Sequence, residues 1–379
     1  MRLLVIGHSY VTPFAQAKYV AMRRLRPDLA LRIVVPPVVR DLFGSYRPER
    51  ASGLLPEELV IIRSFGGGTN MSYVLDPVAL GSLMRRFDPT HIHIEEDPHS
   101  AVGAEAVWLA GRVCAEAALS FFIWDNLNRT PSFPLGIVKR SLTRFGFSRS
   151  RLVICGNEEA RALLIAKGYM GPSEVIPQVG LNPLPPRTVR DHHSSEGRRL
   201  PTIGFVGRLV EEKGILDLLE ALNKVQDVPW RLVIRGDGPL RRELDEKWQP
   251  LFGDRMECLD PIPHAQVARQ LEAMDIFVLP SYSVANWKEQ FGLTLAQAML
   301  AGCACIGSSS GAIPDVLGGS GLVFPERDVP ALETILRALL SSPAERARLG
   351  STARAFALTH YTSEAIAARY LRAFEAMCN

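Results

Sequence analysis

The sequence predicts an α/β protein with two domains, each built on a parallel β-sheet that helices cover. Its 379 residues exceed the length that usually folds around one hydrophobic core. Short apolar segments alternate along the chain with loops and helical patterns, which is typical of parallel sheets. A stretch rich in proline, serine and charge, 184–200, has no periodicity and is the expected linker. The expected domains are therefore 1–183 and 201–360.

The first domain opens with a strand, a loop and a helix. Residues 3–6 form the expected strand, His8 lies in the loop, and a helix is expected over about 13–25. Further strands are expected at 31–36, 91–94, 120–123 and 151–155. Asn157 follows the last of these and is expected to cap a helix. No glycine-rich dinucleotide fingerprint follows the first strand, so the sequence does not support a dinucleotide site.

Polar and aromatic side chains follow the strands at 91–94 and 120–123: Glu95, Glu96, Asp97, Trp124, Asp125 and Asn126. Carboxylates at the carboxyl end of a strand are poorly placed for packing and well placed to line a cleft. The alternative is structural, with Asp97 capping the next helix and Asp125 forming an Asx turn. The histidines of this region lack a matching fourth ligand, so they do not predict a metal site.

The second domain begins with a pattern that fits phosphate binding. A strand at 202–206 is followed by Gly207, Arg208 and Lys213, and then by a helix. Cations at the amino end of a helix oppose its dipole unless an anion lies nearby. Backbone N–H groups at such an end also favour a phosphate. We expect Arg208 and Lys213 to face a diphosphate; the alternative is a basic helix start without a ligand.

The segment 276–306 has the order strand, loop, helix and strand. The loop contains Glu289, the helix is expected at 293–301, and Gln297 lies eight residues after Glu289. Gly292, just before the helix, leaves space for a ligand to approach the backbone. Open α/β sheets bind ligands where the carboxyl end of a strand joins a helix. This loop is therefore the main candidate site; the alternative is an ordinary amphipathic helix after a surface loop.

Several of these segments resemble motifs of glycosyltransferase family 4. Residues 289–293, EQFGL, followed by 297–302, QAMLAG, are similar to its E-x7-E segment. Residues 207–214, GRLVEEKG, are similar to its G-R-L-x-x-x-K-G segment, and 236–239 to its G-x-G-P turn. Residues 95–100 and 124–126 resemble motifs of some bacterial branches. Two positions depart from the pattern: the second glutamate is Gln297, and a histidine that many relatives keep near Trp124 is absent.

The resemblance implies a GT-B architecture, with two Rossmann-like domains facing across a cleft and a C-terminal helix, in 361–379, crossing back to the first. It implies that Glu289 contacts the donor sugar and that Arg208 and Lys213 neutralise the diphosphate. The implied contacts of the donor nucleotide are Gly207, Gly236, Ile262, Phe291, Gly292, Leu293, Thr294 and Gln297. Those on the acceptor side are His8, Glu95, Glu96, Trp124, Asp125 and Asn126.

The implied function is that of a retaining hexosyltransferase. It would move a hexose from a UDP- or GDP-sugar to a glycan, a lipid-linked or a small-molecule acceptor. We expect neither a cofactor nor a metal, because two cations and a helix end already offset the diphosphate charge. One alternative is a nucleotide-sugar epimerase of the same architecture. Another is a non-catalytic sugar-nucleotide binding protein, which Gln297 and the missing histidine favour. A phosphorylase-like enzyme fits less well, because no lysine is apparent for pyridoxal phosphate.

Composition limits the partners and the location. A net charge of +3 is too small to indicate nucleic acid binding. Six cysteines, mostly in apolar runs, indicate buried thiols in a reducing cytoplasm. No apolar run approaches the length of a membrane span, and no signal peptide is expected. Basic clusters at Arg23, Arg24 and Arg26 and at 139–151 indicate either solvated helix faces or a peripheral contact with the inner face of a membrane.

Overall fold

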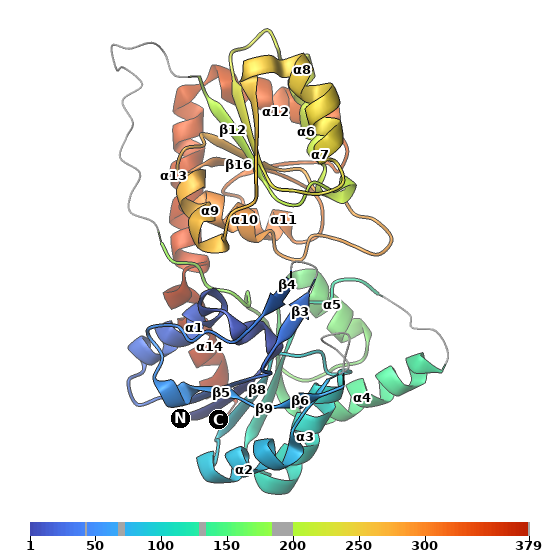
Figure 1. The fold of residues 1–379 in the computed structure, drawn as a ribbon, viewed down its shortest axis with the longest axis vertical. Coiled ribbons are helices and arrows are strands. Elements are labelled where there is room, and N and C mark those ends of the chain that lie inside the picture. The colour runs from blue at the N-terminus through green and yellow to red at the C-terminus, as the bar shows by residue number, and fades with distance from the viewer. Residues whose placement is uncertain (42–43, 67–72, 129–133, 184–199, 378–379) are drawn as a thin grey trace. The chain divides into compact units, whose positions relative to one another are not determined.

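The computed structural model describes residues 1–41, 44–66, 73–128, 134–183 and 200–377 (Figure 1). The chain divides into two compact units. The first comprises Met1–Leu181 together with the segment from Ser363 onward, and the second comprises Asn182–Thr362. The C-terminal helix therefore belongs to the first unit, as predicted. The linker predicted at 184–200 lies outside the described residues except for Leu200.

A parallel sheet forms the centre of the first unit. Within the described residues it has seven strands in the order β11-β10-β9-β8-β1-β2-β5. The strands are β1 Arg2–Ile6, β2 Ala30–Val35, β5 Leu59–Ile61, β8 His91–Ile94, β9 Ala118–Ile123, β10 Ser150–Cys155 and β11 Ser173–Val175. Two short antiparallel pairs lie outside this sheet: β3 Val39–Asp41 with β4 Gly44–Tyr46, and β6 Ser64–Phe65 with β7 Val74–Leu75. The strand order reverses between β1 and β8, and such a switch point is where open sheets bind ligands.

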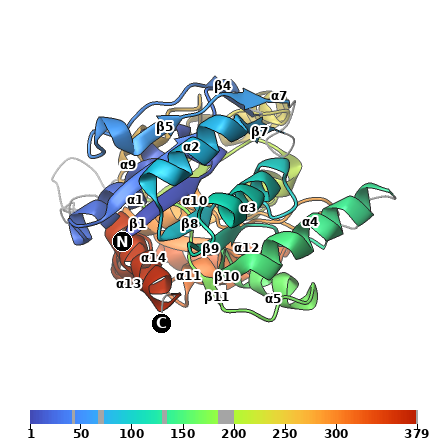
Figure 2. The ribbon, with the colours of Figure 1, turned by 90° about the horizontal axis from the view of Figure 1, so that it is seen from below.

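Helices cover both faces of this sheet. They are α1 Pro13–Leu25, α2 Pro77–Phe87, α3 Ala101–Val113, α4 Leu135–Arg149, α5 Glu158–Ala166 and α14 Ser363–Ala376. Helices α1 and α14 pack on one face, and α2, α3 and α5 contribute to the apolar core on the other. Asn157 caps α5 as predicted, whereas Ser100, and not Asp97, caps α3. The amino-terminal end of helix α4 projects beyond the other helices of the unit, whereas its carboxyl-terminal part packs against α3 and β9 (Figure 2).

The second unit is also built on a parallel sheet. In the part that the structure describes, six strands follow the order β14-β13-β12-β15-β16-β17. They are β12 Thr202–Val206, β13 Arg231–Arg235, β14 Met256–Leu259, β15 Ile276–Leu279, β16 Ala304–Ser308 and β17 Leu322–Phe324. The order reverses between β12 and β15. Both strands are buried along their length, so this point lies at the middle of the sheet.

The described helices of the second unit connect its parallel strands or follow the last strand, β17. They are α6 Ile215–Lys224, α7 Arg241–Glu243, α8 Gln249–Phe252, α9 His264–Leu271, α10 Leu293–Leu300, α11 Ile313–Leu317, α12 Val329–Ser341 and α13 Pro343–His360. Pairs of adjacent parallel strands separated by helices are the pattern of a Rossmann-like sheet. Both units therefore have the predicted class of fold. No helix within the described residues is long and apolar enough to cross a membrane.

An ionised pair lies inside the first unit, where α1, β8 and α14 meet. The ammonium of Lys18 is 2.6 Å from the carboxylate of Glu95, and neither side chain is exposed. Gln178 and the Tyr19 hydroxyl also donate hydrogen bonds to this carboxylate, at 2.9 Å and 2.5 Å. The ring of Tyr370, from α14, lies 4.1 Å from the Lys18 ammonium. Burial alone would raise the pKa of Glu95, but the Lys18 ammonium and the His93 ring lower it below its usual value. The same burial lowers the pKa of Lys18 to about 8.

The double substitution Lys18→Met/Glu95→Gln tests the charge state of this pair. Because the folded-state pKa of Glu95 lies below its usual 4.5, the folded protein binds fewer protons than the unfolded chain as the pH falls through that value. The stability contributed by ionised Glu95 is therefore present above pH 4.5 and lost below it. The difference in unfolding free energy between wild type and variant should change by about 1–2 kcal/mol between about pH 6 and pH 3. Denaturant titrations of both proteins at several pH values measure this difference in unfolding free energy. If the difference does not vary with pH, Glu95 is not ionised in the folded protein.

Candidate functional site

The carboxyl ends of β12 and β15 bring Lys213 and Glu289 together. Lys213 lies in the single 3-10 turn, Glu211–Lys213, that precedes α6. Glu289 lies in the loop between β15 and α10. The Lys213 ammonium is 2.6 Å from a carboxylate oxygen of Glu289. Both side chains are mostly buried, so this ion pair is screened less than a surface pair.

Neighbouring groups fix the position of Glu289. The hydroxyl of Ser281, which is fully buried, donates a hydrogen bond to the Glu289 carboxylate at 3.1 Å. The backbone N–H of Ala312 donates to the Glu289 carbonyl at 3.0 Å. A Cβ atom at Gly311 would lie 2.1 Å from that carbonyl oxygen, so only glycine fits there. The carboxylate is therefore held from both its side chain and its backbone.

The loop from Pro280 to Gly292 also holds Lys213. The indole ring of Trp287 lies 4.6 Å from the Lys213 ammonium, and the backbone of Trp287 pairs with Val284 in a tight turn. The N–H of Tyr282 donates to the carbonyl of Glu212 at 2.9 Å. Gly214 allows this close approach, because a Cβ there would lie 1.9 Å from the Pro280 carbonyl oxygen. Lys213 thus contacts an aromatic face and a carboxylate at once.

Arg208 lies near the same strand ends but is more exposed. Its guanidinium is 3.7 Å from the carboxylate of Glu212, four residues later in the chain. About a third of its side chain is exposed, against 16% for Lys213. Each of the two cations therefore has a carboxylate neighbour. An incoming diphosphate would compete with these carboxylates.

The amino end of α10 adjoins Glu289. Gly292 precedes the helix with φ at +75°, in the left-handed region, and no side chain caps the first turn, which contains Leu293 and Thr294. The first N–H groups of a helix have no partner within it, so they can bind an anion. Gln297 is buried, and its Oε1 has no hydrogen-bond partner among the described residues. A buried acceptor atom without a partner can accept a hydrogen bond from a ligand.

Phe291 and the glycines at strand ends have packing roles that the structure makes visible. The ring of Phe291 lies 5.5 Å from that of Tyr361, edge to face. A Cβ at Gly236 would lie 1.9 Å from the carbonyl oxygen of Gly207, so β12 and β13 approach closely where they end. This close approach explains why glycine is needed at 236.

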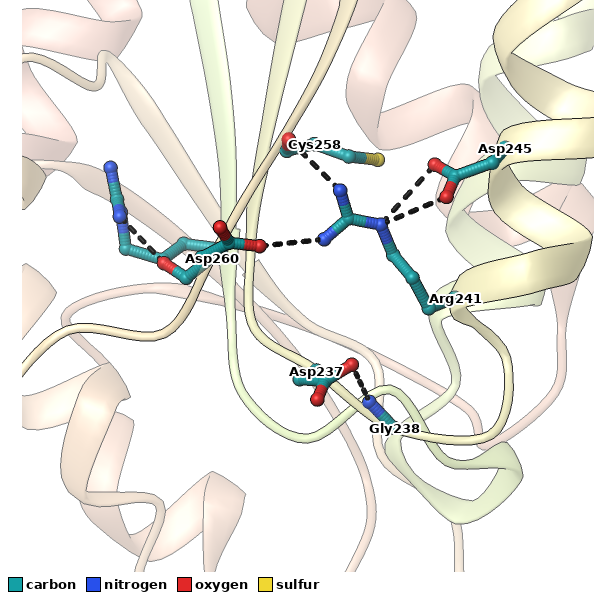
Figure 3. Close-up of polar contacts among 7 residues, drawn as sticks. Asp237, Gly238, Arg241, Asp245, Cys258 and Asp260 are labelled. Atoms are coloured by element: carbon teal, nitrogen blue, oxygen red, sulfur yellow. Dashed lines mark hydrogen bonds and ion pairs between the residues drawn. The ribbon is translucent and has the colours of Figure 1, made fainter.

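Ile262 is half-buried in the otherwise exposed loop after β14, and cationic side chains brace that loop. Arg241 bonds to the carboxylates of Asp245 and Asp260 and to the Cys258 carbonyl (Figure 3). Arg235 donates to the Asp260 carbonyl at 2.7 Å. The loop backbone is therefore held by bonds that do not involve Ile262 itself.

In the first unit, His8 and Glu96 meet at the ends of β1 and β8. One carboxylate oxygen of Glu96 accepts from the His8 N–H and lies 2.7 Å from His8 Nδ1. The hydroxyl of Tyr73 donates to the same oxygen at 2.8 Å. The Glu96 side chain is buried, whereas 23% of the His8 side chain is exposed. His8 is thus the member of the pair that reaches the surface of the unit.

The remaining predicted residues of the first unit are divided between the core and the strand ends. Glu95 lies in the buried pair with Lys18 and does not reach the surface. Trp124 donates from Nε1 to Gln178 at 2.9 Å, and Gln178 in turn bonds to Glu95. Asn126 donates to Glu159 at 3.0 Å, and Asp125 accepts from the N–H of Leu127 at 3.3 Å. The Asx turn considered for Asp125 is therefore present.

Sequence reasoning missed several residues that position the predicted ones: Lys18, Tyr73, Gln178, Arg241, Ser281 and Trp287. Only Ser281 and Trp287 had a local signal, since both lie in the predicted loop. The described residues contain no group of three histidine, cysteine, aspartate or glutamate side chains that could hold a metal ion.

Comparison with known proteins identifies the second unit by sequence and the whole chain by fold. Residues 200–342 match the family model "Glycosyl transferases group 1". A putative teichuronic acid biosynthesis glycosyltransferase of Bacillus subtilis is 46% identical over 79 residues, which are 21% of this chain and 18% of that protein. An MMP alpha-(1->4)-mannosyltransferase of Mycolicibacterium hassiacum is 30% identical over 190 residues, 48% of this chain and 44% of that protein. These matches span less than half the length of either relative.

A solved structure matches over nearly the full chain. The HepE protein of Anabaena, in complex with UDP, superposes with a TM-score of 0.70 over 99% of this chain and 100% of its own, at 16% identity. At this identity the likeness shows the fold alone. The two parallel sheets and this neighbour together show the GT-B fold.

Proposed function

Because residues 200–342 match the group 1 glycosyltransferases and the chain has the GT-B fold, we propose that it is a retaining hexosyltransferase of the family 4 type. The donor is a UDP- or GDP-sugar, and the acceptor is a hydroxyl of a glycan, a lipid-linked or a small molecule. The observation that carries the proposal is the contact of Lys213 with Glu289 beside the uncapped amino end of α10.

The proposed donor site uses each group at the ends of β12 and β15 for one part of the substrate. Arg208, Lys213 and the first N–H groups of α10 bind the diphosphate, because cations and a helix amino end favour anions. Gln297 Oε1 accepts a hydrogen bond from a ribose hydroxyl, which satisfies its buried oxygen. Glu289 accepts from hydroxyls of the sugar. A diphosphate draws Lys213 away from Glu289 and so releases this carboxylate for the sugar.

The proposed reaction is carried mainly by electrostatic stabilisation. The acceptor oxygen bonds to the anomeric carbon while the bond from that carbon to the diphosphate breaks. The acceptor proton passes to the departing diphosphate, whose growing charge Arg208 and Lys213 stabilise. No cofactor takes part. The residues proposed to contact the acceptor are His8, Glu96, Trp124, Asp125 and Asn126. Glu95 acts indirectly, because it bonds to Gln178, which in turn holds Trp124.

The first test separates binding of the nucleotide from transfer of the sugar. Lys213→Met should weaken UDP or GDP binding by about tenfold to a hundredfold, since a charge-assisted hydrogen bond is lost. Glu289→Gln should leave nucleotide binding nearly unchanged and lower kcat/KM for transfer by at least about a hundredfold. Calorimetry and a transfer assay measure the two effects, after thermal-shift screening of UDP-, GDP- and dTDP-sugars has selected the donor.

Lys224→Met is the matched control, because Lys224 is an exposed lysine at the end of α6 in the same unit. Equal weakening of nucleotide binding by both lysine variants would contradict the diphosphate site. Product analysis separates the alternatives. An epimerised donor formed without any acceptor would indicate an epimerase, and donor binding without turnover would indicate a binding protein.

Replacing Gln297 tests the contact with the ribose. Gln297→Glu should tighten donor binding several-fold, because a carboxylate is a stronger acceptor than an amide. Gln297→Ala should weaken donor binding while leaving binding of inorganic diphosphate unchanged. Binding titrations with both ligands measure this. Weaker binding by the glutamate variant would mean that the amide N–H₂ group, and not Oε1, meets the nucleotide.

Metal removal tests whether the cations of the chain suffice for the diphosphate. Initial rates of transfer should be the same with and without EDTA, since Arg208, Lys213 and the α10 amino end offset the charge. Rates after dialysis against chelator, with and without added Mg²⁺ or Mn²⁺, provide the measurement. A strict need for Mn²⁺ would overturn this part of the proposal.

A further inference from the structure

The turn after β17 holds the first residues of the loop that carries Glu289. Both carboxylate oxygens of Glu326 accept from Ser283, one from its hydroxyl at 2.7 Å and the other from its backbone N–H at 2.9 Å. The N–H of Glu326 donates in turn to the Ser309 hydroxyl at 3.1 Å, so the turn is itself fixed to the segment that follows β16. The start of the loop is therefore bonded to the ends of two neighbouring strands.

Arg327, the next residue of this turn, contacts the same loop. Its guanidinium lies 4.4 Å from the ring of Tyr282, whose side chain is mostly buried. Arg327 has φ at +62°, in the left-handed region that L side chains rarely adopt. Backbone strain of this kind persists only where the surrounding structure fixes it, and it clusters at functional sites. The turn thus contacts two consecutive loop residues, Tyr282 and Ser283.

Buried serines connect this contact to Glu289. The Ser283 hydroxyl lies 3.2 Å from that of Ser310, which is fully buried. The Ser310 N–H donates to the Ser308 hydroxyl at 3.2 Å, and that hydroxyl donates to the Ser281 carbonyl. The Ser281 hydroxyl in turn donates to the Glu289 carboxylate. A series of hydrogen-bonded residues therefore joins the turn after β17 to this carboxylate, across the ends of β15 and β16.

The bonds at the start of the loop matter most when a donor is bound. Lys213 contacts both the Glu289 carboxylate and the Trp287 ring, so it holds the middle of the loop. If Lys213 turns to a diphosphate, both contacts are lost together. The loop then depends on the bonds from Glu326 and Ser281 at its start and on the backbone bond to the Glu289 carbonyl at its end. None of these bonds uses a group that is needed for the diphosphate.

We propose that Glu326 is a positioning residue for sugar transfer, which keeps Glu289 in place once Lys213 has turned to the diphosphate. Both oxygens of Glu326 bond to Ser283, so it acts through the loop. A carboxylate suits this position, because its two acceptor oxygens can hold the N–H and the hydroxyl of one serine at once. This role rests on the proposed function where it concerns transfer, whereas its effect on the loop requires only the loss of the Lys213 ammonium.

Hydrogen exchange of the loop amides, 281–291, tests the role of Glu326 in the full chain without any substrate. Glu326→Ala alone should raise the exchange rates by about threefold, since Lys213 still holds the loop. In the Lys213→Met background, which lacks the ammonium, the same change should raise them by at least about fivefold beyond the product of the two single effects. Glu326→Gln should give rates between those of the alanine variant and wild type, because one acceptor oxygen remains. Single effects that merely multiply would overturn the proposal.

Transfer kinetics test the consequence for the reaction. Glu326→Ala should lower kcat by about tenfold or more and leave UDP or GDP binding nearly unchanged, since the groups proposed for the diphosphate are intact. Glu326→Gln should restore part of kcat. In the Glu289→Gln background, Glu326→Ala should lower the residual kcat no further, because the carboxylate that it positions is gone. An equal fall of kcat in both backgrounds would indicate a merely structural role and would overturn the proposal.

Glu220→Ala is the matched control, because Glu220 is an exposed glutamate of α6 in the same unit. It should leave both the loop exchange and kcat unchanged, and effects equal to those of Glu326→Ala would overturn the proposal. If no donor supports transfer, the proposed function fails, and the exchange rates alone decide whether Glu326 holds the loop. Circular dichroism verifies that each variant is folded. If Glu326→Ala does not fold, Ser283→Ala, which removes the hydroxyl bond and keeps the N–H bond, takes its place in both measurements.

Discussion

The contact of Lys213 with Glu289 depends on one property of a parallel sheet: all its strands end at the same edge. These two residues are 76 positions apart in the chain, and each follows a different strand. They meet because β12 and β15 are neighbours at the point where the strand order reverses. Gly214 and Gly311 let the connecting segments approach closer than any side chain would permit. The loop, the start of α10 and the braces from Ser281 and Trp287 all follow from this arrangement.

A neighbouring carboxylate offsets the charge of each of the two cations. Arg208 has Glu212 beside it, and Lys213 has Glu289. Without Glu289, the positive charge of Lys213 would oppose the dipole of α6, which begins two residues later. The site therefore has a stable form with its own carboxylates and, by our proposal, a second form with a diphosphate. The exchange between these two sets of anions would couple binding of the nucleotide to release of Glu289.

In the first unit, the adjacent carboxylates Glu95 and Glu96 point to opposite faces of the sheet at the end of β8. His93 and Glu95 are two residues apart, so their side chains point to the same face of the sheet, which α1 and α14 cover. Glu96 points the other way and meets His8 and Tyr73. Lys18 supplies a buried counter-charge and Gln178 donates a hydrogen bond to Glu95, and together they offset the cost of burying this carboxylate. The Lys18 ammonium also contacts the Tyr370 ring, so the buried pair helps to hold α14 against the rest of the first unit.

The sequence by itself determined the local features of this protein: its strands, its helix starts and its main loop. Apolar segments that alternate with loops and helical patterns identified both parallel sheets, Asn157 identified a helix start, and the spacing of Glu289, Gly292 and Gln297 identified the main loop. The tertiary structure alone decided that Glu95 is buried against Lys18 while Glu96 reaches His8, and that Gln297 Oε1 lacks a partner in the described residues. The physical reason is that caps, turns and periodicity arise from contacts within a few residues. The partner of a buried charge instead depends on which distant strands and helices become neighbours, and Lys18 and Glu95 lie 77 positions apart.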